Sequence, residues 1–137
     1  MRLLVCGGRD YGECRWPMVM SDPIDRAFVE AQQKKFKEVL DGLCLEYGVN
    51  EIISGGARGA DTLARDYAKS AAIEFTEFPV TSYDWGKYGK AAGALRNIKM
   101  LREGEPDLVV AFPGGRGTAH MVSISKAANV KVIEIER

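Results

Sequence analysis

The sequence predicts an α/β fold of Rossmann-like architecture, a three-layer sandwich whose parallel sheet has five strands in the order 3-2-1-4-5 and helices on both faces. Short apolar runs alternate with segments of helical periodicity, and this alternation is typical of parallel sheets with right-handed crossovers. A glycine-rich turn follows three of the apolar runs, at residues 7–10, 54–59 and 113–118. Ligands bind such sheets at the carboxyl ends of the strands, where the strand order reverses. The three turns therefore predict one shared pocket.

Length and composition indicate one domain over residues 1–137, because 46% hydrophobic residues at this length suffice for a core without disulfides or metal. The 19 basic and 19 acidic residues balance, whereas a broad nucleic-acid surface needs a basic excess. The three cysteines form no CxxC pair and are expected to be reduced thiols. No apolar run reaches the roughly 20 residues that cross a bilayer, and no signal-peptide pattern begins the chain. We expect a cytoplasmic protein that binds neither membrane nor nucleic acid.

The first third of the chain begins with a buried strand at residues 3–6. Residues 10–27 have no helical period, and Pro17 and Pro23 interrupt any helix, so this segment is predicted to be a loop or lid. A helix over residues 27–47 follows, because apolar residues recur at i, i+3, i+4, i+7, i+8 and i+11 from Phe36. Glycine at position 48 ends it.

The rest of the chain repeats the pattern of strand and helix. Strands are expected at residues 50–53, 73–79, 107–112 and 130–135, and helices at 60–71, 94–102 and 121–128. Residues 81–93 are rich in Gly, Tyr and Lys and are expected to form a loop.

The turn at residues 113–118 is the strongest single motif. Its glycines would let the backbone wrap a phosphate, and Thr118 offers a hydroxyl that can also cap the next helix. Neither GxGxxG after the first strand nor GxxxxGK[ST] is present, which argues against a Rossmann dehydrogenase and a P-loop NTPase. Each turn alone could also be a plain strand–helix corner.

A basic and aromatic segment at residues 81–102 adds to the predicted pocket. Lys90 and Arg96 would supply charge to a phosphate, and Trp85 would stack on a base. The candidate ligand-binding residues are Gly7, Gly8, Arg9, Ser54, Gly55, Gly56, Ala57, Gly59, Asp61, Trp85, Lys90, Arg96, Asn97, Pro113, Gly114, Gly115, Arg116, Gly117 and Thr118. No metal site is predicted.

Carboxylates in this pattern are the candidate catalytic groups. Asp10 follows the first strand at the predicted switch point. Asp61 occupies the first turn of a helix, where a carboxylate also simply complements the helix dipole. The single histidine, His120, is expected to be a surface or otherwise satisfied side chain.

Together these residues resemble the YspA-like, YpsA-related branch of the SLOG superfamily, a Rossmann-like group that includes the LOG phosphoribohydrolases and DprA. The motifs that carry the resemblance are Gly7-Gly8-Arg9-Asp10-Tyr11, Ser54-Gly55-Gly56-Ala57-Arg58-Gly59-Ala60-Asp61, Trp85 with Gly89-Lys90-Ala91-Ala92-Gly93, Arg96-Asn97-Ile98-Lys99-Met100, and Phe112-Pro113-Gly114-Gly115-Arg116-Gly117-Thr118. They span nearly the whole chain in order. The resemblance implies a ligand that is a nucleotide or is derived from one.

The sequence departs from the LOG pattern at one position. LOG enzymes cleave an N-glycosidic bond with the glutamate of PGGxGTxxE, and Met121 stands at that position here. A thioether can neither stabilise an oxocarbenium-like centre nor move a proton. The first hypothesis is therefore a sensor or binding module for a nucleotide-derived ligand, such as one like NAD or ADP-ribose.

Two other hypotheses remain open. One is a hydrolase acting on the glycosidic or phosphate bond of such a ligand, with Asp10 or Asp61 as the carboxylate. The other is a DNA-handling protein by analogy with DprA, against which the zero net charge argues. No resident cofactor is expected, although magnesium is compatible with a phosphorylated ligand, and the apolar helix faces are compatible with a homodimer.

Overall fold

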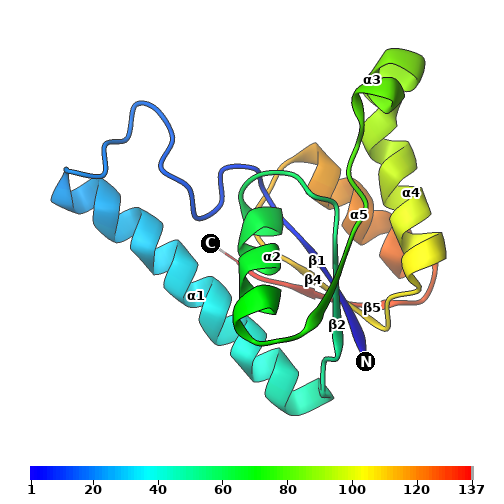
Figure 1. Cartoon of the computed structure of the whole chain (residues 1–137), viewed down its shortest axis with the longest axis horizontal. Coiled ribbons are helices and arrows are strands. Elements are labelled where there is room, and N and C mark those ends of the chain that lie inside the picture. Colours follow the sequence, from blue (N-terminus) through cyan, green and yellow to red (C-terminus); the bar gives the residue numbers. More distant parts are fainter. Residues whose placement is uncertain (137) are drawn as a thin grey trace.

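A computed structural model of the chain describes residues 1–136 and contains a five-stranded parallel sheet in the order β3-β2-β1-β4-β5 (Figure 1). This confirms the predicted Rossmann-like fold and strand order. The elements are β1 (Arg2–Cys6), α1 (Pro23–Tyr47), β2 (Glu51–Ser54), α2 (Ala60–Ser70), β3 (Glu74–Glu77), α3 (Ser82–Tyr88), the 3-10 helix η1 (Gly89–Ala91), α4 (Ala92–Gly104), β4 (Leu108–Ala111), α5 (Arg116–Ala127) and β5 (Lys131–Glu134). None of these helices combines the length and hydropathy of a membrane span.

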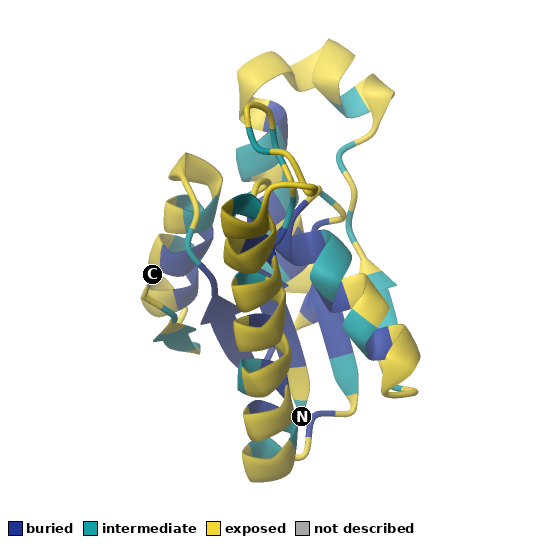
Figure 2. Cartoon of the chain, turned by 90° about the vertical axis from the view of Figure 1, so that its left-hand side faces the viewer, coloured by how far each residue is buried: buried dark blue, intermediate teal, exposed yellow. Residues whose placement is uncertain are grey.

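The two faces of the sheet have separate cores because side chains alternate along each strand. From β1, Leu3 and Val5 join a cluster with the buried side chains of α1 and α2. Leu4 and Cys6 join a second cluster with those of α4 and α5. Figure 2 shows the buried strands between the helices and the exposed outer face of α1.

The prediction that residues 10–27 form a loop is wrong for its last five residues, because α1 begins at Pro23. Proline at the first helical position loses no hydrogen bond, since that N–H has no partner within the helix. The Asp22 carboxylate caps the helix and accepts hydrogen bonds from the N–H groups of Ile24 and Asp25. At the other end, Gly48 adopts a φ of 66° and donates to the Cys44 carbonyl, which confirms the prediction that this glycine ends the helix.

The loop before α1, residues 10–22, is fastened to that helix at Gly12. The Gly12 N–H donates to the Gln32 Oε1 at 2.8 Å, and its carbonyl accepts from the Gln33 Nε2 at 2.9 Å. The neighbouring Tyr11 ring packs against Phe112 with centroids 5.2 Å apart. The loop is thereby held over the carboxyl end of the sheet.

The segment at residues 81–93 is helical rather than a loop. Thr81 and Asp84 form a capping box in which each side chain accepts from the backbone N–H of the other residue. The capping box stabilises the start of α3 and so offsets the low helix propensity of the glycines in this segment, which favours the prediction of a loop. Short α3 has no buried residue and stands apart from the sheet (Figure 1).

Candidate functional site

The sheet topology brings the three glycine turns together. Strand β1 lies between β2 and β4, so the turns that follow these strands meet at one edge. The first turn lies between the other two: the Gly8 N–H donates to the Pro113 carbonyl at 2.9 Å, and the Ala60 N–H donates to the Gly8 carbonyl at 3.2 Å. This is the carboxyl-end switch point of the fold.

The glycines of these turns have two different roles. A Cβ on Gly8 would lie 2.9 Å from the Pro113 carbonyl oxygen, and one on Gly59 would overlap the Gly8 carbonyl. These glycines allow the turns to pack on one another. By contrast, a Cβ on Gly115 or Gly117 would meet no atom within 4 Å. Only the latter pair leaves the backbone open to a ligand.

The turns and α4 enclose a cavity of about 590 Å³, which we call the first cavity. Its size suits a small-molecule ligand. It is lined by Cys6, Gly7, Gly8, Arg9, Gly55, Ala57, Asp61, Lys90, Gly93, Ala94, Arg96, Asn97, Met100, Gly115, Arg116, Gly117, Thr118, His120 and Met121.

The N-terminus of α5 opens into the first cavity with unpaired N–H groups. Its N-cap residue, Gly115, has no side chain to accept from them. Within residues 1–136, no hydrogen bond uses the N–H of Arg116, Gly117 or Thr118. These donors and the positive end of the helix dipole favour an anion at this point.

The turn at residues 54–59 is different, because protein groups already occupy three of its N–H donors. The Ala57 N–H donates to the Asp61 Oδ2 at 3.0 Å, and the Gly59 N–H to the Glu13 Oε1 at 2.8 Å. The Ser54 Oγ accepts from the Gly56 N–H at 3.4 Å. This turn holds the walls of the site in place, whereas the end of α5 has free donors.

Four basic side chains and one carboxylate line the first cavity: Arg9, Lys90, Arg96, Arg116 and Asp61. Within this set, Arg96 is the most constrained. Its Nη1 donates to the Gly55 carbonyl at 2.5 Å and to the Phe78 carbonyl at 3.3 Å. Burial lowers the pKa of the Arg96 guanidinium; nearby Asp61 opposes this effect and nearby Arg9 adds to it. The excess of positive charge would favour an anion in this cavity.

The two candidate carboxylates lie in different places. Asp61 is 7% exposed and faces the first cavity. Burial raises its pKa, although the Ala57 N–H, Arg96 and Ser54 each oppose the shift. Asp10 is exposed and forms an ion pair with Arg15 outside this cavity. Of these two candidates, therefore, only Asp61 lines the first cavity.

A hydrogen-bonded pair on α4 and α5 brings His120 into the site. The Asn97 Oδ1 accepts from the Arg96 Nε at 3.1 Å, which fixes the amide orientation. The Asn97 Nδ2 donates to the Gly117 carbonyl at 3.2 Å and faces the His120 Nδ1 at 3.1 Å. Since that neighbour is a donor, the His120 Nδ1 accepts, and a neutral ring carries its proton on Nε2. Spacing alone did not reveal this contact, because it crosses between helices.

Three sulfur-containing side chains, those of Cys6, Met100 and Met121, also line the first cavity. Burial raises the pKa of the Cys6 thiol to about 12, so the thiol stays protonated and unreactive at neutral pH. Met121 is 1% exposed and packs in the same apolar cluster as Cys6 and Met100. The Met121 side chain therefore forms part of an apolar wall of the first cavity.

Several candidate residues lie outside the first cavity. Ser54, Gly56 and Gly59 support its walls, while Pro113 and Gly114 line a neighbouring cavity. Trp85 is on α3, is 44% exposed and lines neither cavity. Across the described residues 1–136, no group of three or more His, Cys, Asp or Glu side chains could hold a metal ion.

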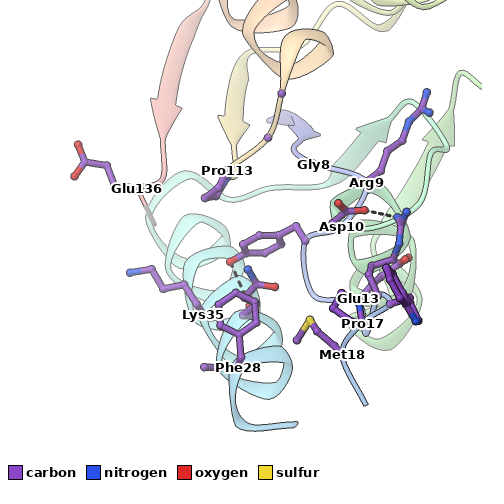
Figure 3. Close-up of a pocket in the computed structure, with 17 residues that line it drawn as sticks. Gly8, Arg9, Asp10, Glu13, Pro17, Met18, Phe28, Lys35, Pro113 and Glu136 are labelled. Atoms are coloured by element: carbon purple, nitrogen blue, oxygen red, sulfur yellow. Dashed lines mark hydrogen bonds and ion pairs between the residues drawn. The ribbon is translucent and has the colours of Figure 1, made fainter. Parts of the chain in front are cut away.

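The neighbouring cavity, which we call the second cavity, has a volume of about 840 Å³ and lies between the loop at residues 10–22 and α1 (Figure 3). Residues that sequence reasoning did not place in a site line it, among them Tyr11, Met18, Phe28, Gln32 and Lys35. Their only signal was the length of the first loop. The surface appears only when the loop folds back on the helix.

No family model matches the chain. Its fold, however, is shared with a protein of known structure. The X-ray structure of TM1055, a structural genomics target, superimposes with a TM-score of 0.65 at 18% sequence identity. The match covers 96% of this chain and 71% of that one. It shows a common Rossmann-like fold.

A closer relative comes from a bacteriophage. The Gene 61 protein of Mycobacterium phage D29 is 43% identical over 86 residues, which are 60% of this chain and 68% of that protein. Identity of this extent shows common descent, and the chain therefore belongs to the family of the Gene 61 protein of Mycobacterium phage D29.

Proposed function

We propose that the protein binds a nucleotide-derived small molecule as a sensor or binding module, and that the first cavity holds the phosphate of this ligand. The observation that carries the proposal is the charge of the cavity. Four basic side chains and one carboxylate line it, at the uncapped N-terminus of α5. A phosphate there would accept hydrogen bonds from the free N–H groups and interact favourably with the positive end of the helix dipole.

The arrangement of the arginines supports this assignment. Arg96 is held in place by two carbonyl oxygens and by Asn97, so it is preorganised. Arg9 is exposed and lies close enough to Arg96 to lower its pKa. An anion between these two cations would relieve their repulsion, and charge-assisted hydrogen bonds of this kind are stronger than neutral ones.

The resemblance of residues 112–118 to the phosphate-binding turn of the SLOG superfamily agrees with this location. The same resemblance, together with Met121, favours binding over the LOG reaction, because Met121 is a buried apolar side chain where LOG enzymes have a glutamate. The proposal therefore assigns the turn to ligand capture.

A hydrolytic function is the second candidate, and Asp61 is the observation that favours it. It is the one carboxylate that lines the first cavity, and burial raises its pKa as a general acid requires. In this case AMP or NAD is consumed by the protein, and Asp61→Asn abolishes turnover. Recovery of intact AMP and NAD after long incubation would exclude the hydrolase.

Calorimetric titration with ribose 5-phosphate, AMP and ADP-ribose, with and without magnesium, tests the binding proposal. We expect Arg9→Ala to weaken binding about tenfold or more, the usual effect of losing a charge-assisted hydrogen bond. Arg58→Ala is the matched control, since Arg58 is exposed on the turn at residues 54–59 and lines neither cavity. The absence of binding by all three compounds at millimolar concentration would overturn the proposal.

A further inference from the structure

The second cavity has no role in the proposed phosphate site, although it directly adjoins that site. Gly8, Arg9 and Gly115 line both cavities. The backbone at Gly8 and the N-cap of α5 therefore form a common rim. A ligand with its anion at α5 can extend over this rim into the second cavity.

The second cavity has apolar and aromatic walls that no protein group covers. Met18 comes from the loop and Phe28 from α1, and both side chains line the cavity (Figure 3). Phe28 is 56% exposed. The Tyr11 ring is buried against Phe112 and closes the inner side. Such a surface suits a flat, apolar-faced group.

One polar group of fixed orientation, the Gln32 amide, and two charged side chains accompany these walls. The Gln32 Oε1 accepts from the Gly12 N–H, which directs the amide, and its Nε2 makes no hydrogen bond within residues 1–136. Lys35 and Glu136 line the same space (Figure 3). Donors and an acceptor beside aromatic side chains match the polar edge and the flat faces of a heteroaromatic ring.

We propose that the second cavity is a nucleobase subsite, in which Phe28 and Met18 contact the face of the ring and Gln32 donates to its edge. The inference rests on the proposed function, because the same ligand places its phosphate at α5. The subsite is formed before binding, since Gly12 joins the loop to α1 through both of its backbone groups. The inference assigns base recognition to α1 and the loop at residues 10–22 rather than to Trp85.

Titrations with ribose 5-phosphate, adenosine and AMP separate the two sites. We expect AMP to bind more tightly than ribose 5-phosphate. Phe28→Ala should weaken the binding of AMP and adenosine about tenfold and leave the affinity for ribose 5-phosphate unchanged. Leu45→Ala is the control, because Leu45 is 90% exposed on the same helix and lines neither cavity. Binding of AMP and ribose 5-phosphate with equal affinity, unaffected by Phe28→Ala, overturns the subsite and leaves the phosphate site standing. Adenosine binding without ribose 5-phosphate binding overturns the phosphate site instead, and binding of none overturns both.

The two tryptophans of the chain provide a second, independent measurement. Trp16 lines the second cavity and Trp85 lines neither. In the Trp85→Phe variant, AMP is expected to change the emission of Trp16, whereas ribose 5-phosphate leaves it unchanged. In the Trp16→Phe variant, AMP is expected to leave the emission of Trp85 unchanged. A response of Trp85 without a response of Trp16 overturns the inference.

Discussion

The Arg96 guanidinium on α4 donates a hydrogen bond of 2.5 Å to the Gly55 carbonyl in the turn after β2. This contact joins a helix from one face of the sheet to a turn that leads to the other face. It fixes one wall of the first cavity, and it also explains why position 55 has no side chain, since a Cβ there would lie 2.5 Å from the Arg96 Nη1.

The Arg96→Ala variant should lose stability by about 1–3 kcal/mol, because the Gly55 and Phe78 carbonyls and the Asn97 side chain lose a partly buried donor. It should also weaken AMP binding. Urea unfolding and calorimetry measure the two effects. Arg102→Ala, an exposed arginine of the same helix, is expected to change neither. Equal unfolding midpoints for Arg96→Ala and Arg102→Ala would contradict the structural role of this contact.

Gly117→Leu should raise stability and abolish phosphate binding. A Cβ at this helical position meets no atom, and replacing a helical glycine stabilises by about 0.5–1 kcal/mol. The added side chain would occupy space at the N-terminus of α5 that the ligand needs. Gly42→Leu on α1 is the control, since it has equal room but lies outside both cavities. Thermal unfolding and titration with ribose 5-phosphate check the result, and wild-type affinity in Gly117→Leu would argue against the site.

Asp61→Asn should change how stability depends on pH. Burial raises the Asp61 pKa above its ordinary value of 3.8, so ionisation of this group destabilises the folded protein. The wild type should therefore lose stability relative to Asp61→Asn as the pH rises above about 3.8 through the folded pKa. The lowered pKa values of Asp41 and Asp84 act equally in both proteins and cancel in the difference. Urea unfolding of both proteins from acidic to neutral pH tests this, and a constant difference would contradict it.

Asp22→Ala should destabilise the protein by about 1 kcal/mol, because α1 loses the carboxylate that accepts from Ile24 and Asp25. Asp22→Asn should retain most of the stability, since the amide oxygen can accept the same hydrogen bonds. Thermal unfolding of the two variants separates the cap from a general charge effect. If Asp22→Asn lowers the unfolding temperature as much as Asp22→Ala does, then the charge of Asp22 contributes more to stability than its capping hydrogen bonds.

The sequence by itself determined the architecture and the order of the strands. The alternation of apolar runs with helical periods shows which side chains are buried on folding. Burial of apolar side chains is the dominant favourable contribution to folding, so this pattern predicts the fold. Local signals also set some boundaries, such as Gly48 at the end of α1. Periodicity does not predict the start of α1 or the formation of α3, because both depend on capping side chains, those of Asp22 and Thr81.

Only the tertiary structure decided how the candidate residues divide among roles. The sequence cannot distinguish Gly59, which packs against the Gly8 carbonyl, from Gly117, which faces open space, because the difference depends on atoms distant in the chain. The same holds for His120 on α5, which lies within hydrogen-bond distance of Asn97 on α4, and for Phe28, which lines a cavity together with the loop at residues 10–22. Periodicity records burial along one element, whereas a site depends on which elements come into contact.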